Sequence, residues 1–182
     1  WQAHALRPRV MRTLAGGHSR STLLGRPLAC PVLAAPVAYQ RMAHAEGEIG
    51  TALAASVLGM GMVLSTQSST PLEDVAHAAG DRATRGPLWF QLYLQPDRGL
   101  TRSLVQRAEA AGYDAIVLTV DAPCQGVRDR ERRAGFRLPP GIRAVHLPPT
   151  EAQPHPAEHR GTGLFDGLLA QAPTWDDLAW LC

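Results

Sequence analysis

The apolar residues of the chain fall into short unbroken runs, and between those runs they recur every three or four positions. The clearest run is Ala115–Val120, which is rich in β-branched residues and is typical of a strand covered on both faces. The helical spacing of the intervening segments predicts amphipathic helices. The chain therefore predicts strands and helices in alternation. The predicted strands are 31–36, 62–65, 88–93 and 115–120, and the predicted helices cover 46–59, 71–79 and 100–111.

Two of the predicted helices carry explicit start signals. Thr70-Pro71-Leu72-Glu73 has the form of a capping box with proline at the first helical position. Thr174-Trp175-Asp176-Asp177 predicts the N-terminus of a fourth helix. The run 128–137 holds five arginines together with acidic residues, so we interpret it most simply as a solvated helix face.

The predicted strands recur roughly every 27–30 residues with one helix between them, which is the βα period of parallel α/β folds. A doubly wound sheet would give the same pattern. A barrel is favoured because each strand ends in a different polar residue and no glycine-rich phosphate loop follows the first strand. A complete TIM (β/α)8 barrel needs about 250 residues, so we predict an α/β barrel of which this chain holds about the first four βα units.

We expect one domain over residues 1–182, forming the N-terminal half of that barrel. An amphipathic run that is still open at Cys182 and a first residue that is not methionine suggest a piece of a longer protein. The expected parts are N-terminal strands and turns over 1–31, including extended segments at Arg9–Thr13 and Ser21–Leu24, βα units over 32–137, a long loop over 138–173 and a helix start over 174–182.

Composition narrows the function classes. A net charge of +2 is too small to indicate a nucleic-acid or membrane-surface partner, and no apolar run reaches membrane-spanning length. The chain contains no lysine, which excludes a Schiff-base lysine and a P-loop lysine within it. Three scattered cysteines indicate reduced thiols and a cytoplasmic location. His146, His155 and His159 lie in the proline-rich loop without metal-ligand partners, so we predict no metal site.

Hydrogen-bonding groups of the backbone or of side chains follow each predicted strand, where the carboxyl ends of parallel strands form a common rim. The groups are neutral except for one carboxylate and one arginine, a set that suits a flat polar heterocycle and, through the arginine fork, a carboxylate. The candidates are Pro36, Val37 and Ala38 after the first strand, Ser65 and Gln67 after the second, Gln91 and Tyr93 at the third, and Thr119, Asp121 and Arg128 after the fourth.

Four separated segments resemble the FMN-dependent 2-hydroxy acid oxidase family, which includes glycolate, lactate, mandelate and hydroxymandelate oxidases. The similarity covers nearly the whole chain and keeps the order of the motifs. The segments are AAPVAYQRMAHAEGE (35–48), LSTQSS (64–69), WFQLY (89–93) and LTVDAPCQGVRDRERRAGFRLPP (118–140).

The resemblance implies FMN as cofactor and a role for each rim residue. The backbone at 36–38 is expected beside the flavin ring, and the side chains of Ser65, Gln91 and Thr119 at its polar edge. Tyr93 is expected to stabilise charge on the substrate, and Gln67 to tune side-chain specificity. The remaining two residues are Asp121, expected to orient the catalytic histidine, and Arg128, expected to bind the substrate carboxylate.

In that family a histidine takes the hydroxyl proton while the C2 hydrogen and its electron pair pass to the flavin. The histidine, a second arginine, a lysine and the phosphate-binding loops belong to the second half of the barrel, so this chain alone is expected to be inactive. For the intact protein we predict oxidation of a lactate- or mandelate-type 2-hydroxy acid, with oxygen or another electron acceptor and a homo-oligomeric state. The alternatives are a catalytically inactive half-barrel, as a split-enzyme subunit or remnant, and a different FMN- or phosphate-binding barrel enzyme.

Overall fold

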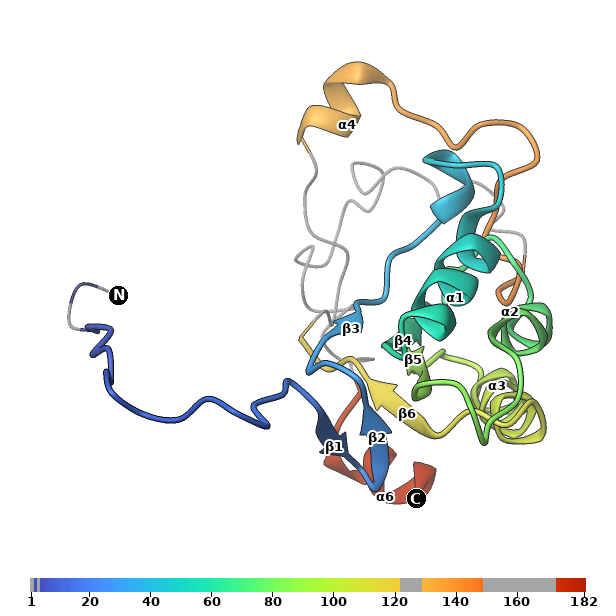
Figure 1. Ribbon diagram of the computed structural model, residues 1–182. Helices are drawn as coiled ribbons and strands as arrows, with labels where there is room; N and C mark the ends of the chain where they lie inside the picture. Colours follow the sequence, from blue (N-terminus) through green and yellow to red (C-terminus); the bar gives the residue numbers. More distant parts are fainter. Residues whose placement is uncertain (1, 3, 122–128, 149–172) are drawn as a thin grey trace.

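The computed structural model describes residues 2, 4–121, 129–148 and 173–182, and its elements alternate after an N-terminal hairpin (Figure 1). The elements are β1 (Ser21–Leu23), β2 (Arg26–Leu28), β3 (Leu33–Ala34), the 3-10 helix η1 (Gln40–Met42), α1 (Gly47–Val57), β4 (Gly61–Leu64), α2 (Leu72–Ala79), β5 (Leu88–Leu92), α3 (Arg98–Ala110), β6 (Ala115–Leu118), α4 (Asp129–Ala134) and α6 (Trp175–Leu181).

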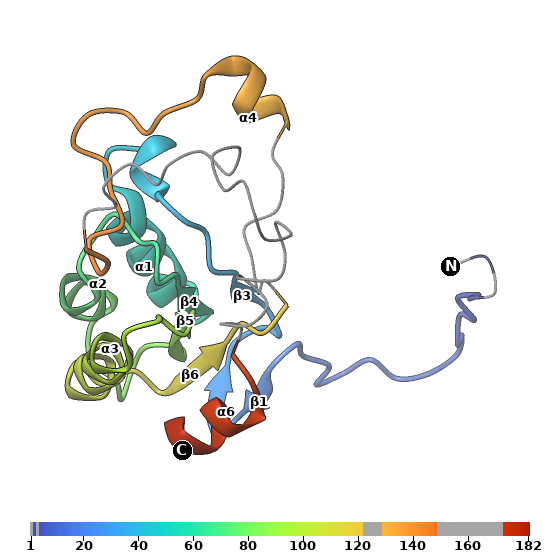
Figure 2. The ribbon, with the colours of Figure 1, turned by 180° about the vertical axis from the view of Figure 1, so that it is seen from behind.

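The four strands after the hairpin form one parallel sheet in chain order, β3-β4-β5-β6. The intervening helices α1, α2 and α3 pack in sequence against one another and lie together on one side of the sheet (Figures 1 and 2). A doubly wound sheet would reverse its strand order and carry helices on both faces. The sequential order and the single helical layer are those of a barrel segment, which confirms the predicted fold class.

The buried strands are the two central ones, and this differs from the prediction for the fourth strand. All four residues of β4 are buried, and so are all residues of β5 except Trp89. The residues of β6 are only half-buried, and Val120, predicted to lie within that strand, follows its end and is 76% exposed. The physical reason is that β6 is the outer strand of the described sheet and is paired on one side only.

The start of α2 also differs from the predicted capping box. Pro71 is the N-cap and not the first helical residue, and no side chain of the 70–73 segment caps the helix. The Thr70 hydroxyl donates instead to Glu48 Oε2 at 2.8 Å. The imidazole of His146 supplies a capping acceptor instead, because its Nε2 accepts the Leu72 N–H at 2.9 Å. A tertiary contact thus satisfies the helix end that the local motif was expected to satisfy.

The N-terminal region forms a single hairpin, in which β1 pairs antiparallel with β2. Leu24 and Gly25 have φ values of 47° and 75°, and two positive φ angles in succession are what a two-residue type I′ turn requires. The extended segment predicted at Arg9–Thr13 does not form a strand. Residues 4–20 run away from the sheet, and their side chains are exposed (Figure 1).

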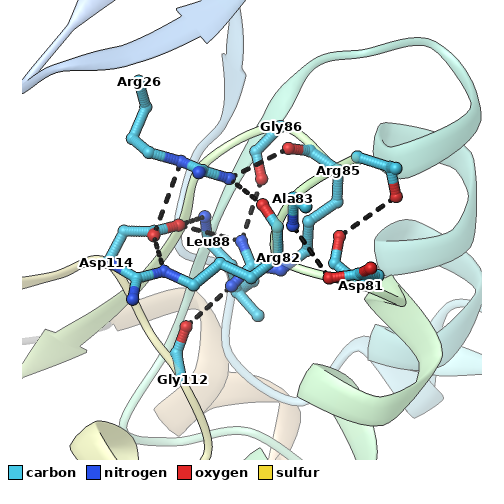
Figure 3. A network of polar contacts seen from close by, with 10 residues as sticks. Arg26, Asp81, Arg82, Ala83, Arg85, Gly86, Leu88, Gly112 and Asp114 are labelled. Atoms are coloured by element: carbon cyan, nitrogen blue, oxygen red, sulfur yellow. Dashed lines mark hydrogen bonds and ion pairs between the residues drawn. The ribbon is translucent and has the colours of Figure 1, made fainter.

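A buried carboxylate joins this hairpin to the amino-terminal end of the sheet (Figure 3). Asp114 immediately precedes β6, and its side chain is 3% exposed. Its oxygens accept from Arg82 Nε at 2.7 Å, Arg85 Nη1 at 2.9 Å and Leu88 N at 3.0 Å. Arg26 of β2 lies 3.5 Å from the same carboxylate and donates to the carbonyl of Arg82. This cluster lies at the end of the strands opposite the predicted rim.

The helix predicted after Thr174 is present as α6, and it begins with a capping box, in which the Asp177 carboxylate accepts the Thr174 N–H at 2.8 Å. Asp177 also accepts from Arg98 Nη2 of α3 at 2.6 Å, so α6 is tied to the start of that helix. In the described part of the chain, no helix combines the length and the apolar character needed to cross a membrane.

Candidate active site

Three of the predicted cofactor-binding side chains form one hydrogen-bonded line across the carboxyl ends of β4, β5 and β6. Ser65 Oγ donates to Gln91 Oε1 at 3.4 Å, and Gln91 Nε2 donates to Thr119 Oγ1 at 2.9 Å. Ser65 and Gln91 are buried and Thr119 is half-buried. The line exists because each residue lies at or just beyond the end of its strand, and parallel strands bring those ends to one edge.

Thr66 lies at the centre of this arrangement, and sequence reasoning missed it. Its side chain is fully buried. Its N–H donates to Gln91 Oε1 at 3.1 Å, and its hydroxyl donates to the Gln91 carbonyl at 2.6 Å and accepts the Tyr93 N–H at 3.2 Å. Since Gln91 Oε1 faces the Thr66 N–H, the Gln91 NH2 group is directed to Thr119. The only sequence signal was a hydroxyl residue between Ser65 and Gln67.

Glu48 is a second buried polar residue that sequence reasoning missed, and it connects the segments after β3 and β4. Oε1 accepts the N–H groups of Gln40 at 3.1 Å and Ser69 at 2.8 Å, and Oε2 accepts the hydroxyls of Ser69 and Thr70, each at 2.8 Å. Burial by itself would raise the Glu48 pKa, but the hydrogen bonds from Ser69 and Thr70 outweigh it, and the pKa lies below its ordinary value.

A glutamate in the first turn of a predicted helix is ordinarily solvent-exposed, so the sequence contained no signal for this role. The two segments also contact each other directly. The Tyr39 N–H donates to the Gln67 carbonyl at 3.1 Å, and the Arg41 N–H donates to Ser69 Oγ at 3.2 Å. The backbone after β3 is therefore held by several polar contacts against the turn that follows β4 and contains Gln67 (the Gln67 turn).

His146 was predicted to be an ordinary residue of a proline-rich loop, but it is buried beneath the rim with 4% of its surface exposed. Nδ1 lies 3.1 Å from the Thr66 carbonyl, and the ring makes an edge contact with Phe90. Because Nε2 accepts the Leu72 N–H, the proton is on Nδ1 and donates to Thr66. Burial lowers the His146 pKa, and the cationic Arg107 acts in the same direction, against the opposing bond to Thr66.

The other predicted site residues do not belong to the hydrogen-bonded line of Ser65, Gln91 and Thr119. Tyr93 and Gln67 are half-buried, and Tyr93 O accepts from Gln95 Nε2 at 2.8 Å. Asp121 is exposed. Arg128 lies outside the described residues, and so does Cys124. Of the segment after β3, Pro36 and Val37 are exposed and Ala38 is half-buried.

The donor set at the rim suits the polar edge of a flavin. Gln91 Nε2 carries a second N–H beside the one bonded to Thr119, and the Thr119 hydroxyl accepts from Nε2 and so keeps its own proton to donate. These groups are neutral and already oriented by protein contacts, which matches a heterocycle with both donors and acceptors. Within the described residues, no group of three or more His, Cys, Asp or Glu side chains could hold a metal ion.

The geometry defines a class of protein: a parallel α/β barrel segment with a preorganised, neutral polar site at the carboxyl ends of its strands. Comparison with known proteins makes this specific. The family profile described as FMN-dependent dehydrogenase matches residues 1–182. The chain therefore belongs to the FMN-dependent dehydrogenase family, which confirms the family resemblance deduced from the motifs.

Known relatives agree with this assignment. The chain is 48% identical to the L-lactate oxidase of Nostoc sp. over 179 residues, which cover 97% of this chain and 49% of the relative. It is 37% identical to 2-hydroxyacid oxidase 1 of Homo sapiens, over 97% of this chain and 48% of the relative. The chain thus spans about half the length of the curated relatives that it matches.

A solved structure gives the same result for the fold. A mutant of mandelate oxidase with a C4a-OH-FMN adduct is 41% identical and superposes with a TM-score of 0.72, over 78% of this chain and 41% of the oxidase. FMN is thus the cofactor associated with both the family and a structural neighbour.

Proposed function

We propose that the intact protein containing this chain oxidises a 2-hydroxy acid to the corresponding 2-oxo acid with bound FMN, and that this chain supplies one side of the active site. The observation that carries the proposal is the line Ser65–Gln91–Thr119, a preorganised set of hydrogen-bonding groups at the barrel rim of a chain in this family. Bound FMN supplies the acceptor for the C2 hydrogen and its electron pair.

The proposed cofactor contacts follow from the accessible groups of the rim. The side chains of Ser65, Gln91 and Thr119 hold the polar edge of the flavin, and their mutual hydrogen bonds fix their orientation before the cofactor binds. The backbone of residues 36–38 lies along the ring. The next two residues keep this segment in place, since the Tyr39 N–H donates to the Gln67 carbonyl and the Gln40 N–H donates to Glu48.

The proposed substrate contacts come from the same rim. Tyr93 stabilises negative charge that develops on the substrate oxygens, and Arg128 binds the substrate carboxylate through its planar fork. Gln67 lies within the turn after β4 and contacts the substrate side chain. Asp121 orients the general-base histidine, which the remaining part of the protein supplies.

The substrate that we favour is of the lactate or mandelate type, since the relatives named L-lactate oxidase and mandelate oxidase are 48% and 41% identical to this chain. We further propose that oxygen or another electron acceptor reoxidises the flavin, that the intact protein is a cytoplasmic homo-oligomer, and that residues 1–182 form the first half of its barrel.

The test is to continue the coding sequence past Cys182, express the intact protein and assay it against lactate, glycolate, mandelate and 4-hydroxymandelate. The expected result is a protein with a bound-flavin absorption spectrum that oxidises lactate or a mandelate faster than glycolate. Bound flavin with fastest oxidation of glycolate would contradict the substrate type. Absence of flavin after reconstitution with FMN would contradict the proposed function itself.

A further inference from the structure

The main-chain ladder between β4 and β5 ends before the residues that face the substrate. The last paired residues are Leu64 and Phe90, and on the other side of β5 they are Leu92 and Leu118. Tyr93 lies beyond both. Its N–H donates to the Thr66 hydroxyl at 3.2 Å, and its carbonyl accepts from the Gln95 side chain at 2.8 Å. Side chains thus hold the backbone of Tyr93 where the sheet no longer does.

Thr66 is itself a fixed point. Its side chain is fully buried, its N–H donates to Gln91 Oε1 at 3.1 Å, and its carbonyl accepts from His146 Nδ1 at 3.1 Å. The hydroxyl has a single proton, which it donates to the Gln91 carbonyl at 2.6 Å, and a lone pair then faces the Tyr93 N–H. The hydroxyl therefore satisfies the carbonyl of the buried Gln91 and the N–H of the half-buried Tyr93, and it holds the chain where it leaves β5.

We propose that Thr66 is a positioning residue for Tyr93, acting through its side-chain hydroxyl. The inference rests on the proposed function, since it concerns the alignment of the Tyr93 phenol with the substrate. A displacement of the reacting groups by about 1 Å can reduce turnover by up to about a hundredfold. Loss of the hydroxyl should therefore act on turnover and leave FMN binding almost unchanged, because the Gln91 side chain is held by the Thr66 N–H and not by the Thr66 hydroxyl.

The variants separate the hydroxyl from the shape of the side chain. Thr66→Val removes the hydroxyl and keeps the branched shape, and Thr66→Ser keeps the hydroxyl. Thr66→Ala serves if the valine variant does not fold, because it places no methyl group against the two polar backbone groups. Tyr113→Phe is the matched control, since it removes a buried hydroxyl that donates to the Leu72 carbonyl at 2.9 Å and not to a group of Gln91 or Tyr93.

The first readout is hydrogen exchange of the Tyr93 amide in the intact protein, which does not depend on activity. We expect exchange to accelerate at least about tenfold in Thr66→Val or Thr66→Ala, and to stay near wild type in Thr66→Ser and Tyr113→Phe. Unchanged protection in the valine and alanine variants would overturn the proposal, and so would equal acceleration in the serine variant.

The second readout is steady-state kinetics with FMN affinity measured in parallel. We expect kcat to fall about tenfold or more in the variants without the hydroxyl, with FMN dissociation constants within about threefold of wild type and with near-normal kcat in Thr66→Ser. Faster exchange without a loss of kcat would overturn the positioning role. A wild-type protein that oxidises no 2-hydroxy acid would instead contradict the proposed function, while the exchange data would still decide whether Thr66 holds Tyr93.

Discussion

The Asp114 cluster gives a graded set of stability predictions, because one buried carboxylate binds arginines of very different exposure. Figure 3 shows Arg82 and Arg85 on the same carboxylate. The Asp114 and Arg85 side chains are each 3% exposed, whereas Arg82 is 61% exposed. Removing one partner of a buried ion pair costs about 3–5 kcal/mol, because the other charge stays buried without compensation. An exposed pair contributes at most about 1 kcal/mol.

Asp114→Asn and Arg85→Met should therefore each lower the free energy of unfolding by about 3–5 kcal/mol, and Arg82→Ala by less than about 1 kcal/mol. Arg85→Met additionally leaves the carbonyls of Gly86 and Gly112 without the donors that now lie 2.9 and 2.7 Å away. These magnitudes hold although the Arg82 and Arg85 contacts have similar lengths, 2.7 and 2.9 Å. Burial, and not distance, is expected to decide the ranking.

Urea denaturation of the intact, FMN-loaded protein measures these differences, since urea does not screen ion pairs as guanidinium chloride does. Burial alone would raise the Asp114 pKa, but the hydrogen bonds from Leu88, Arg82 and Arg85 outweigh it and lower the pKa. The contribution of the carboxylate is therefore present above its ordinary pKa and is lost as the pH falls through the lower folded-state value. Equal losses for Arg82→Ala and Arg85→Met, or a negligible loss for Asp114→Asn, would refute the reasoning.

Three further predictions concern the rim. Glu48→Gln should lower the free energy of unfolding by about 1–2 kcal/mol, because the amide oxygen still accepts the two backbone N–H groups and the hydroxyls can turn to accept from the NH2 group. Glu48→Ala should lower it by about 4 kcal/mol. Similar urea midpoints for the two variants would contradict this difference. Because burial lowers the folded-state pKa of His146 below its ordinary value of 6.5, the unfolded state binds the proton first. Stability should then fall as the pH drops below about 6.5, and His146→Gln should flatten that dependence, so an unchanged pH slope would exclude the histidine as its source. Arg128→Ala should raise KM for the 2-hydroxy acid at least about tenfold with normal FMN content, and an unaltered KM would remove the carboxylate assignment.

Local sequence signals were sufficient for the alternation of strands and helices and for the family. The helix at Trp175–Leu181 begins at its predicted N-terminus, and β4, β5 and β6 lie within one to two residues of their predicted bounds. Each of these features depends on residues that are close in sequence or on an apolar period. The motifs at the strand ends could also be recognised locally, since each one comes directly after its own strand in the sequence.

Two of the failures occurred where a residue far away in the chain satisfies a hydrogen-bonding group. Thr70 has the local form of a helix cap, but its hydroxyl is bound to Glu48, 22 positions earlier. The Leu72 N–H is accepted by His146, 74 positions later, from a segment whose composition indicated only a loop. Neither pairing leaves a trace in residue spacing, because it depends on which segments the folded sheet brings together.

By itself, the sequence determined the order of the elements, the barrel class, the family and the set of candidate side chains at the rim, because these properties follow from local periodicity and from motifs. Only the tertiary structure decided how those side chains are held. The parallel pairing of β4, β5 and β6 places Ser65, Gln91 and Thr119 in one line, and the buried groups that support this rim are Thr66, Glu48 and His146. Buried polar groups require hydrogen-bond partners, and the partners available to each group are known only when the strands are in register.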